Sequence, residues 1–398
     1  MPFNLIKLNF FLVLAILLFN INLFGQSQNF IHQLSVPFNC TSASSVEFCK
    51  QISNDSIAIV GLGEFTHGGH EPIAYKSELV KFLISQKSFR KLLVEFPNVT
   101  LISLNNYLID SSKIDTSKLV SIVDDSFGQA IRDTSFLSLI RWLKMYNYTH
   151  QSAVVTVKGI DIEGEAQYFS SYVIHNLLIY LDEKSGRKLL EDTKKKPLDS
   201  ILEIELSWID QNRELVKKTI GNDKFNNLLE EIKMVKLSLE HDKLKKIDSF
   251  KAAKFRDSIM SILVTSSATS KSILWSHNMH ITTSSTSISM GNYLKRTWGN
   301  RYFTILTDFS GESEISVPVG FRKYNLKSYK SNKNSIPYIL RRRFKIKEGI
   351  VSLTDLKKNG ISPSYNEIDA DGNYRIVGND SPFNFLVFFD IVHPLRLY

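Results

Sequence analysis

Histidines and carboxylates follow two short apolar segments of the chain, directly where each segment ends. Glu64, His67, His70 and Glu71 follow the first, and a His-Asn-x-His motif follows the other at residues 277–280. These two motifs hold four of the nine histidines in the chain. A neutral imidazole can take a proton from water at about pH 7, and imidazoles and carboxylates also bind metal ions. The motifs therefore indicate either water activated by a histidine base or a metal held by His and Glu.

The elements that must position these residues are buried strands that alternate with helices. Five apolar, β-rich segments end in polar or glycine-containing turns, and helical patterns at 73–86 and 135–146 lie between them. This alternation predicts an α/β protein with a mainly parallel central sheet flanked by helices. Since the carboxyl ends of parallel strands share one edge, we expect the polar residues that follow the strands to converge there. The predicted strands are 56–62, 91–94, 153–160, 272–275 and 302–306, and the other three segments add Glu95, Asp161, Glu163 and Asp308.

A charged segment at residues 187–256 interrupts this pattern. It contains one proline and one glycine, and its apolar residues recur at helical spacing between 228 and 239. Such spacing predicts two or three long amphipathic helices. We expect this helical insertion to cover the crevice at the strand ends.

Composition and absent motifs exclude several classes of protein. The sequence has no Gly-x-Ser-x-Gly elbow, no phosphate loop and no Gly-rich dinucleotide fingerprint. The net charge of +9 lies entirely in residues 322–348, which carry ten basic residues and one acid, ten minus one being nine. The rest of the chain sums to zero, so we expect no nucleic-acid partner, and we interpret 322–348 as a solvated loop and helix.

The N-terminus is typical of an export signal. Lys7 precedes an apolar run over residues 8–19, and Gly25 is a small residue suited to cleavage. The run is too short for a membrane anchor. The sequence thus predicts a signal peptide at 1–25 and a mature domain at 26–398 that is periplasmic or secreted, with no membrane association after cleavage. In that oxidising setting Cys40 and Cys49 are slightly favoured to form a disulfide over remaining free thiols.

Taken together, these motifs resemble the erythromycin esterase family over about residues 40 to 320. The segments that carry the resemblance are Gly63-Glu64-x-Thr66-His67-Gly68, Glu95, Trp142-Leu143-x-x-Tyr146-Asn147, Gly159-x-Asp161, Arg256-Asp257-x-x-Met260 and Trp275-x-His277-Asn278-x-His280. The resemblance implies an enzyme that adds water to an ester, with a small-molecule ester as partner, a macrolide lactone among the candidates. It implies no cofactor.

The resemblance also implies roles for individual residues. His67 is the general base, Glu64 and Glu95 orient it or the water, and the rate should fall as the pH drops through a histidine pKa of about 6.5. His277, His280 and Arg256 face the developing oxyanion or the leaving alkoxide, and Lys76 shares that role. The residues expected to bind the substrate are Lys76, Asp161, Arg256, His70 and Glu71. The expected site is rich in carboxylates, which suit a substrate that bears an amine; they are Glu64, Glu71, Glu95, Asp161 and Glu163.

Two alternatives stay open at this point. One is a metallohydrolase in which Glu64, His67, His277 and His280 hold a divalent ion. The other is a binding protein with a decayed site, which the retention of every motif His and Glu disfavours. One departure from the family pattern is the region ahead of Trp142, where Ser135 and Ser138 stand and no acidic residue is evident.

Overall fold

The computed structural model describes most of the chain from Ile31 to Tyr398. The predicted signal peptide at 1–25 and Cys40 lie outside the described residues, whereas Cys49 is buried and disulfide-bonded. No helix within the described part of the chain is long and apolar enough to cross a bilayer. The described residues are 31–32, 34, 46–110, 117–128, 131–170, 187–188, 191, 196–269, 271–283, 288–320, 323–378 and 382–398.

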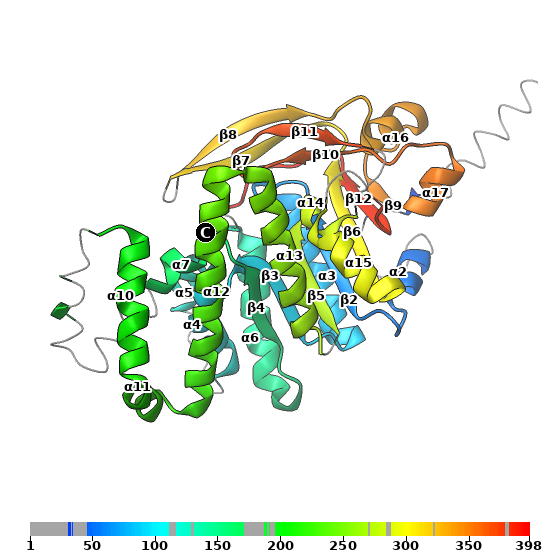
Figure 1. Cartoon of the computed structure of the whole chain (residues 1–398). Helices are drawn as coiled ribbons and strands as arrows, with labels where there is room; N and C mark the ends of the chain where they lie inside the picture. Colours follow the sequence, from blue (N-terminus) through cyan, green and yellow to red (C-terminus); the bar gives the residue numbers. More distant parts are fainter. Residues whose placement is uncertain are drawn as a thin grey trace, which may run out of the picture.

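An eight-stranded sheet forms the centre of the molecule (Figure 1). Its strand order is β1-β9-β12-β6-β2-β5-β3-β4, and the six strands from β12 to β4 run parallel. Only β9 and β1 add antiparallel pairs at one edge. This confirms the predicted α/β fold, and all five predicted strands belong to the parallel part. The bounds are β1 Ile31–His32, β2 Ile59–Glu64, β3 Lys91–Pro97, β4 Thr156–Asp161, β5 Ser272–His277, β6 Tyr302–Phe309, β9 Gly349–Ser352 and β12 Phe385–Phe389.

Helices cover both faces of the sheet, which is why its strands are apolar on both sides. Alternate strand residues enter two separate cores: Leu92 and Val94 pack with one layer of helices, and Leu93 packs with the other. The first layer contains α3 His70–Lys87, α4 Ile102–Ile109, α5 Leu119–Phe127 and α6 Thr134–Thr149. The second contains α13 Ser249–Ser267, α15 Met290–Trp298, α16 Ile336–Phe344 and α17 Leu353–Lys358.

The insertion is helical as predicted, but its helices do not end at 256. A new helix begins after Asp248, whose side chain caps it by accepting hydrogen bonds from the backbone N–H groups of Phe250 and Lys251. The resulting helix α13 runs on to Ser267 and packs against the sheet, while the preceding helices form a small core with Val99, Ala166 and Phe169 beyond β4 (Figure 1). Those helices are α10 Leu198–Gln211, α11 Arg213–Ile220 and α12 Asn222–Ile247.

Two β-hairpins also lie at the carboxyl end of the sheet, where the sequence predicted only a helical cover. Ser316 of one hairpin donates its N–H to the carbonyl of Gly68, and Ile368 of the other donates to the carbonyl of Phe65. Both contacts clamp the loop that follows β2, and a side chain at Gly68 would overlap the Ser316 carbonyl. The hairpins are β7 Glu312–Gly320 with β8 Lys323–Lys330, and β10 Tyr365–Ile368 with β11 Tyr374–Val377.

Most of the described basic residues of 322–348 lie on β8 and α16 (Figure 1). Lys323, Lys327 and Lys330 are exposed on β8, and Arg342 and Arg343 are exposed on α16. Much of the excess positive charge of the chain therefore lies on strand β8 and helix α16.

Candidate active site

Glu64 and His67 form a hydrogen-bonded pair where β2 ends. His67 Nδ1 lies 2.6 Å from Glu64 Oε1. A carboxylate only accepts, so Nδ1 carries the hydrogen and the lone pair of Nε2 is left for chemistry. The His67 side chain keeps 24% of its surface exposed, whereas that of Glu64 keeps 2%. The pair therefore presents one accessible, oriented imidazole at the carboxyl edge of the sheet.

The surroundings of Glu64 keep its carboxyl group ionised. Its Oε2 accepts from Lys76 Nζ on α3 at 2.8 Å and from Trp275 Nε1 on β5 at 3.0 Å. Burial alone would raise the pKa of Glu64, but the charge of Lys76 and the contact with His67 outweigh it and lower the pKa to about 2. Burial likewise opposes protonation of His67, yet the bond to Glu64 and its charge raise the pKa of His67 above its usual value. Glu64 thus orients His67 and makes it a stronger base.

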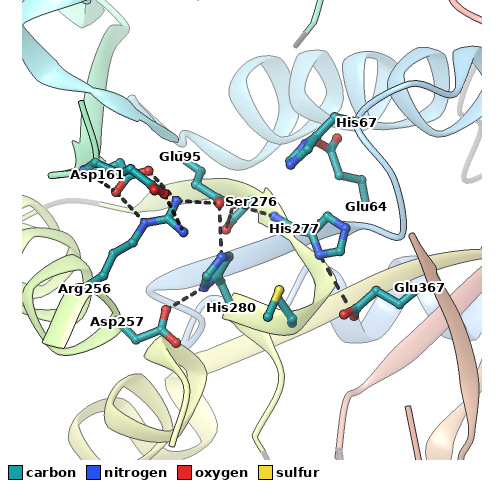
Figure 2. A network of polar contacts seen from close by, with 12 residues as sticks. Glu64, His67, Glu95, Asp161, Arg256, Asp257, Ser276, His277, His280 and Glu367 are labelled. Atoms are coloured by element: carbon teal, nitrogen blue, oxygen red, sulfur yellow. Dashed lines mark hydrogen bonds and ion pairs between the residues drawn. The ribbon is translucent and has the colours of Figure 1, made fainter. Parts of the chain in front are cut away.

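Glu95, at the end of β3, is the centre of a second network (Figure 2). Its Oε2 accepts from Ser276 Oγ at 2.6 Å and from the His277 N–H at 2.8 Å. Its Oε1 pairs with Arg256 at 3.1 Å and with His280 Nε2 at 3.2 Å. Burial raises the pKa of a carboxyl group, but His280 and Arg256 hold the pKa of Glu95 well below its usual range. With donors on both oxygens, Glu95 is a structural anion that joins β3, β5 and α13.

The two cations around Glu95 are themselves enclosed by carboxylates. His280 Nδ1 lies 2.5 Å from Asp257 Oδ1, and despite burial the two acids raise the pKa of His280 to about 10. Arg256 also donates through Nε to Asp161 Oδ1 at 2.8 Å. Sequence reasoning placed His280 and Arg256 toward the reacting ester. The contacts show instead that both side chains hold Glu95, with His280 protonated at neutral pH.

His277 differs from both other histidines of the site. Its ring centre lies 5.1 Å from that of His67, and its Nε2 lies 3.1 Å from the carbonyl oxygen of Ile368. Burial lowers the pKa of His277, so its ring is neutral at neutral pH. His277 is therefore neutral and His280 protonated at neutral pH, while His67 is the accessible ring whose free nitrogen has a raised affinity for protons.

The structure does not bring every predicted site residue together. His70 Nδ1 contacts Asp133 Oδ2 at 2.9 Å, and Glu71 Oε1 contacts His393 Nδ1 at 2.7 Å. Asp133 Oδ2 also accepts from the Arg396 N–H, so these residues hold the C-terminal segment rather than join the network around Glu95. Lys76, placed by sequence reasoning with the substrate, is buried against Glu64.

Three acidic residues that contact these histidines were not predicted from the sequence to belong to the site. Asp133 precedes α6 and caps it by accepting from the Ser135 N–H at 2.8 Å, so an acid does stand ahead of Trp142. Its Asp-Thr-Ser context is a helix-start signal that would have revealed it. Asp257 stood in a quoted motif without a role. Glu367 on β10 carries no sequence signal and reaches His277 only through the fold.

Comparison with known protein families shows to which family this chain belongs. A model described as erythromycin esterase matches residues 84–317, which is more than half of the chain. The chain belongs to the erythromycin esterase family. The matched span holds Glu95 and the residues that surround it, while Glu64 and His67 precede the span and Glu367 follows it.

Solved structures share the fold of this family member at low sequence identity. A Bacillus cereus protein is 18% identical, covering 95% of this chain and 99% of its own, with a TM-score of 0.65. A succinoglycan biosynthesis protein is 17% identical, covering 94% and 97%, with a TM-score of 0.66. A mutant of the erythromycin esterase EreC in its open conformation is 15% identical, covering 89% and 96%, with a TM-score of 0.59. No significant match was found among curated proteins.

Membership of the erythromycin esterase family supports hydrolase chemistry, and the contacts bear on which kind. Both ring nitrogens of His280 contact carboxylates, and both oxygens of Glu64 accept hydrogen bonds. Among the described residues, no group of three or more His, Cys, Asp or Glu is arranged to hold a metal ion. Two members of the metallohydrolase alternative, Glu64 and His280, thus already pair with protein groups through these atoms.

A cavity of about 670 Å³ lies beside this network, along the outer edge of β4. Asp161 and Glu231 both line it. Glu231 faces Glu165, which is completely buried at the start of α7 Glu165–Tyr168. Burial and the adjacent Glu231 raise the pKa of Glu165 to about 10, so Glu165 holds a proton at neutral pH.

Replacing Glu165 by glutamine is expected to stabilise the protein at alkaline pH. A carboxyl group whose pKa is higher in the folded than in the unfolded protein stabilises the folded protein fully at pH values below the unfolded pKa. This contribution is lost as the pH rises toward about 10, the pKa of Glu165 in the folded protein. Glutamine supplies the donor to Glu231 without a proton to lose. We expect a gain of about 2 kcal/mol at pH ~9 and little gain at pH ~5, measured by urea unfolding. Glu230→Gln, at an exposed position, should change neither value, and an equal Glu165→Gln effect at both pH values would contradict the assignment.

Proposed function

We propose that this chain hydrolyses a carboxylic ester with a water molecule that His67 activates. The observation that carries the proposal is the Glu64 and His67 pair, in which a buried carboxylate orients a partly exposed imidazole at 2.6 Å. Membership of the erythromycin esterase family supports the same reaction class. The fixed tautomer leaves Nε2 as the accepting atom.

The reaction would proceed by proton transfer through one imidazole. His67 Nε2 takes a proton from water while the water oxygen forms a bond to the ester carbonyl carbon. Glu64 stabilises the imidazolium that results, as a buried carboxylate does for a catalytic histidine. The imidazolium then returns the proton to the alkoxide as the carbon–oxygen bond breaks. The products are one acid and one alcohol, or one hydroxy acid from a lactone.

A macrolide lactone is the first substrate to test, because the family takes its name from erythromycin. The sequence argument for an amine-bearing substrate rested on a carboxylate-rich rim. In the structure Glu64, Glu95 and Asp161 are each paired with a cation, and Glu71 pairs with His393. Those charges are therefore not free to attract an amine, and the support for a macrolide comes from the family.

The test is to incubate the purified protein with a panel of macrolides and a panel of simple esters. Mass spectrometry should show a gain of one water for a lactone, or the separate acid and alcohol for an open ester. The product should be absent with the His67→Asn protein. If no member of either panel is cleaved, or if both proteins cleave alike, the proposal is wrong.

A further inference from the structure

His277 and Glu367 face each other through two buried polar atoms, and neither atom receives a hydrogen bond from a described residue. His277 Nδ1 lies 4.0 Å from Glu367 Oε2 (Figure 2). The two side chains are 3% and 0% exposed. Neither atom has a hydrogen-bond partner among the described residues. Unpaired buried polar atoms are costly, so such a pair is informative when it lies next to a catalytic group.

Both atoms are hydrogen-bond acceptors. The carbonyl of Ile368 can only accept, so His277 Nε2, which contacts it at 3.1 Å, carries the hydrogen of the neutral ring. Nδ1 is therefore a bare lone pair. Glu367 Oε1 accepts from Arg375 Nε at 2.9 Å, which leaves its other oxygen, Oε2, facing His277 Nδ1 as an acceptor. A ligand that contacts both atoms must bring hydrogens of its own.

The charge around the pair selects the kind of donor. Arg375 already neutralises Glu367, and His277 is uncharged, so the pair offers no net charge to an ammonium group. The other histidines near His277 are His67 and the protonated His280, which add no negative charge. Neutral hydroxyl groups fit these two acceptors better than a cation does.

We propose that His277 Nδ1 and Glu367 Oε2 form a hydroxyl-binding subsite beside the catalytic base, selecting esters with hydroxyl groups close to the scissile bond. The location follows from the 5.1 Å between the rings of His277 and His67. Two hydroxyls on adjacent carbons supply one hydrogen to each acceptor. This inference rests on the proposed esterase function, which places the scissile bond at His67. It assigns a specificity role to the C-terminal hairpin β10–β11, which lies beyond the matched family span.

The test compares the glycerol monoester with the propyl ester of butyric acid, which differ only in their hydroxyl groups. The wild-type protein should prefer the glycerol ester in kcat/KM by at least about tenfold, the worth of a good hydrogen bond. In Glu367→Gln the amide hydrogens occupy His277 Nδ1, and the preference should fall toward one. Glu312→Gln, an exposed position on β7, should keep the full preference.

Binding measurements separate this inference from the esterase proposal. Calorimetry with the His67→Asn protein should show tighter binding of the glycerol ester, and the additional Glu367→Gln change should remove that difference. A binding preference without any turnover by the wild-type protein would keep the subsite and reject the esterase. Equal binding and equal turnover of the two esters, or a preference that survives Glu367→Gln, would overturn the subsite. A purely structural role of Glu367 would lower stability without changing the ratio between the esters.

Discussion

The His67→Asn protein should fold normally and lose about 100- to 10,000-fold in kcat, the range attributed to a positioned general base. Asparagine preserves a polar side chain that can still donate to Glu64, so the packing around β2 is kept. It has no nitrogen lone pair that can take a proton from water. The measurement is the steady-state rate on whichever ester the panel identifies, with thermal unfolding recorded in parallel.

The matched control for this change is His150→Asn. His150 is exposed at the end of α6 and stacks on Tyr146, apart from the network around Glu95. That protein should keep the wild-type rate. A His67→Asn protein that is folded and within about threefold of the wild-type rate would remove His67 as the base.

The largest effect on stability is expected for Glu95→Ala. Its carboxylate neutralises Arg256 and His280 at once and accepts from Ser276 and the His277 backbone. Removing one partner of a buried ion pair leaves an uncompensated charge, and such changes cost about 3–5 kcal/mol. Urea unfolding at neutral pH measures the loss, and activity should fall with it because His277 loses its anchor.

Asp55→Asn provides the control for the loss of a charged pair. Asp55 pairs with Lys271 at 2.9 Å, but its side chain is 95% exposed, so the change should cost far less stability than the loss of Glu95. Equal, small losses for Glu95→Ala and Asp55→Asn would show that the Glu95 network is not a source of stability.

The sheet was predictable because its strands are short, apolar and separated by helices. The five runs from 56–62 to 302–306 all proved to be parallel strands, and Glu64, Glu95, Asp161 and His277 fall at their carboxyl ends. The two hairpins were not predicted. Strand β8 is mostly exposed and polar, so it lacks the apolar signal of a core strand.

The residues that form the site were partly predictable from the sequence, whereas the contacts and protonation state of each residue were not. Strand-end position identified His67, His277 and His280, but position says nothing about what each ring nitrogen contacts. Only tertiary contacts show that Asp257 and Glu95 flank His280 and that Ile368 fixes the tautomer of His277. Glu367 comes from a segment far along the chain and was beyond local patterns.

The pH dependence of kcat/KM, compared between the wild-type and Glu64→Gln proteins, tests the central claim most directly. His67 must be unprotonated to act, so activity is present above its pKa and lost below it. Glu64 raises the pKa of His67, so the wild-type acid limb should have its midpoint above the ordinary histidine value of about 6.5, higher than the sequence alone suggested. In Glu64→Gln the midpoint should move to lower pH. A flat profile, or the same midpoint in both proteins, would contradict a base formed by His67 and Glu64.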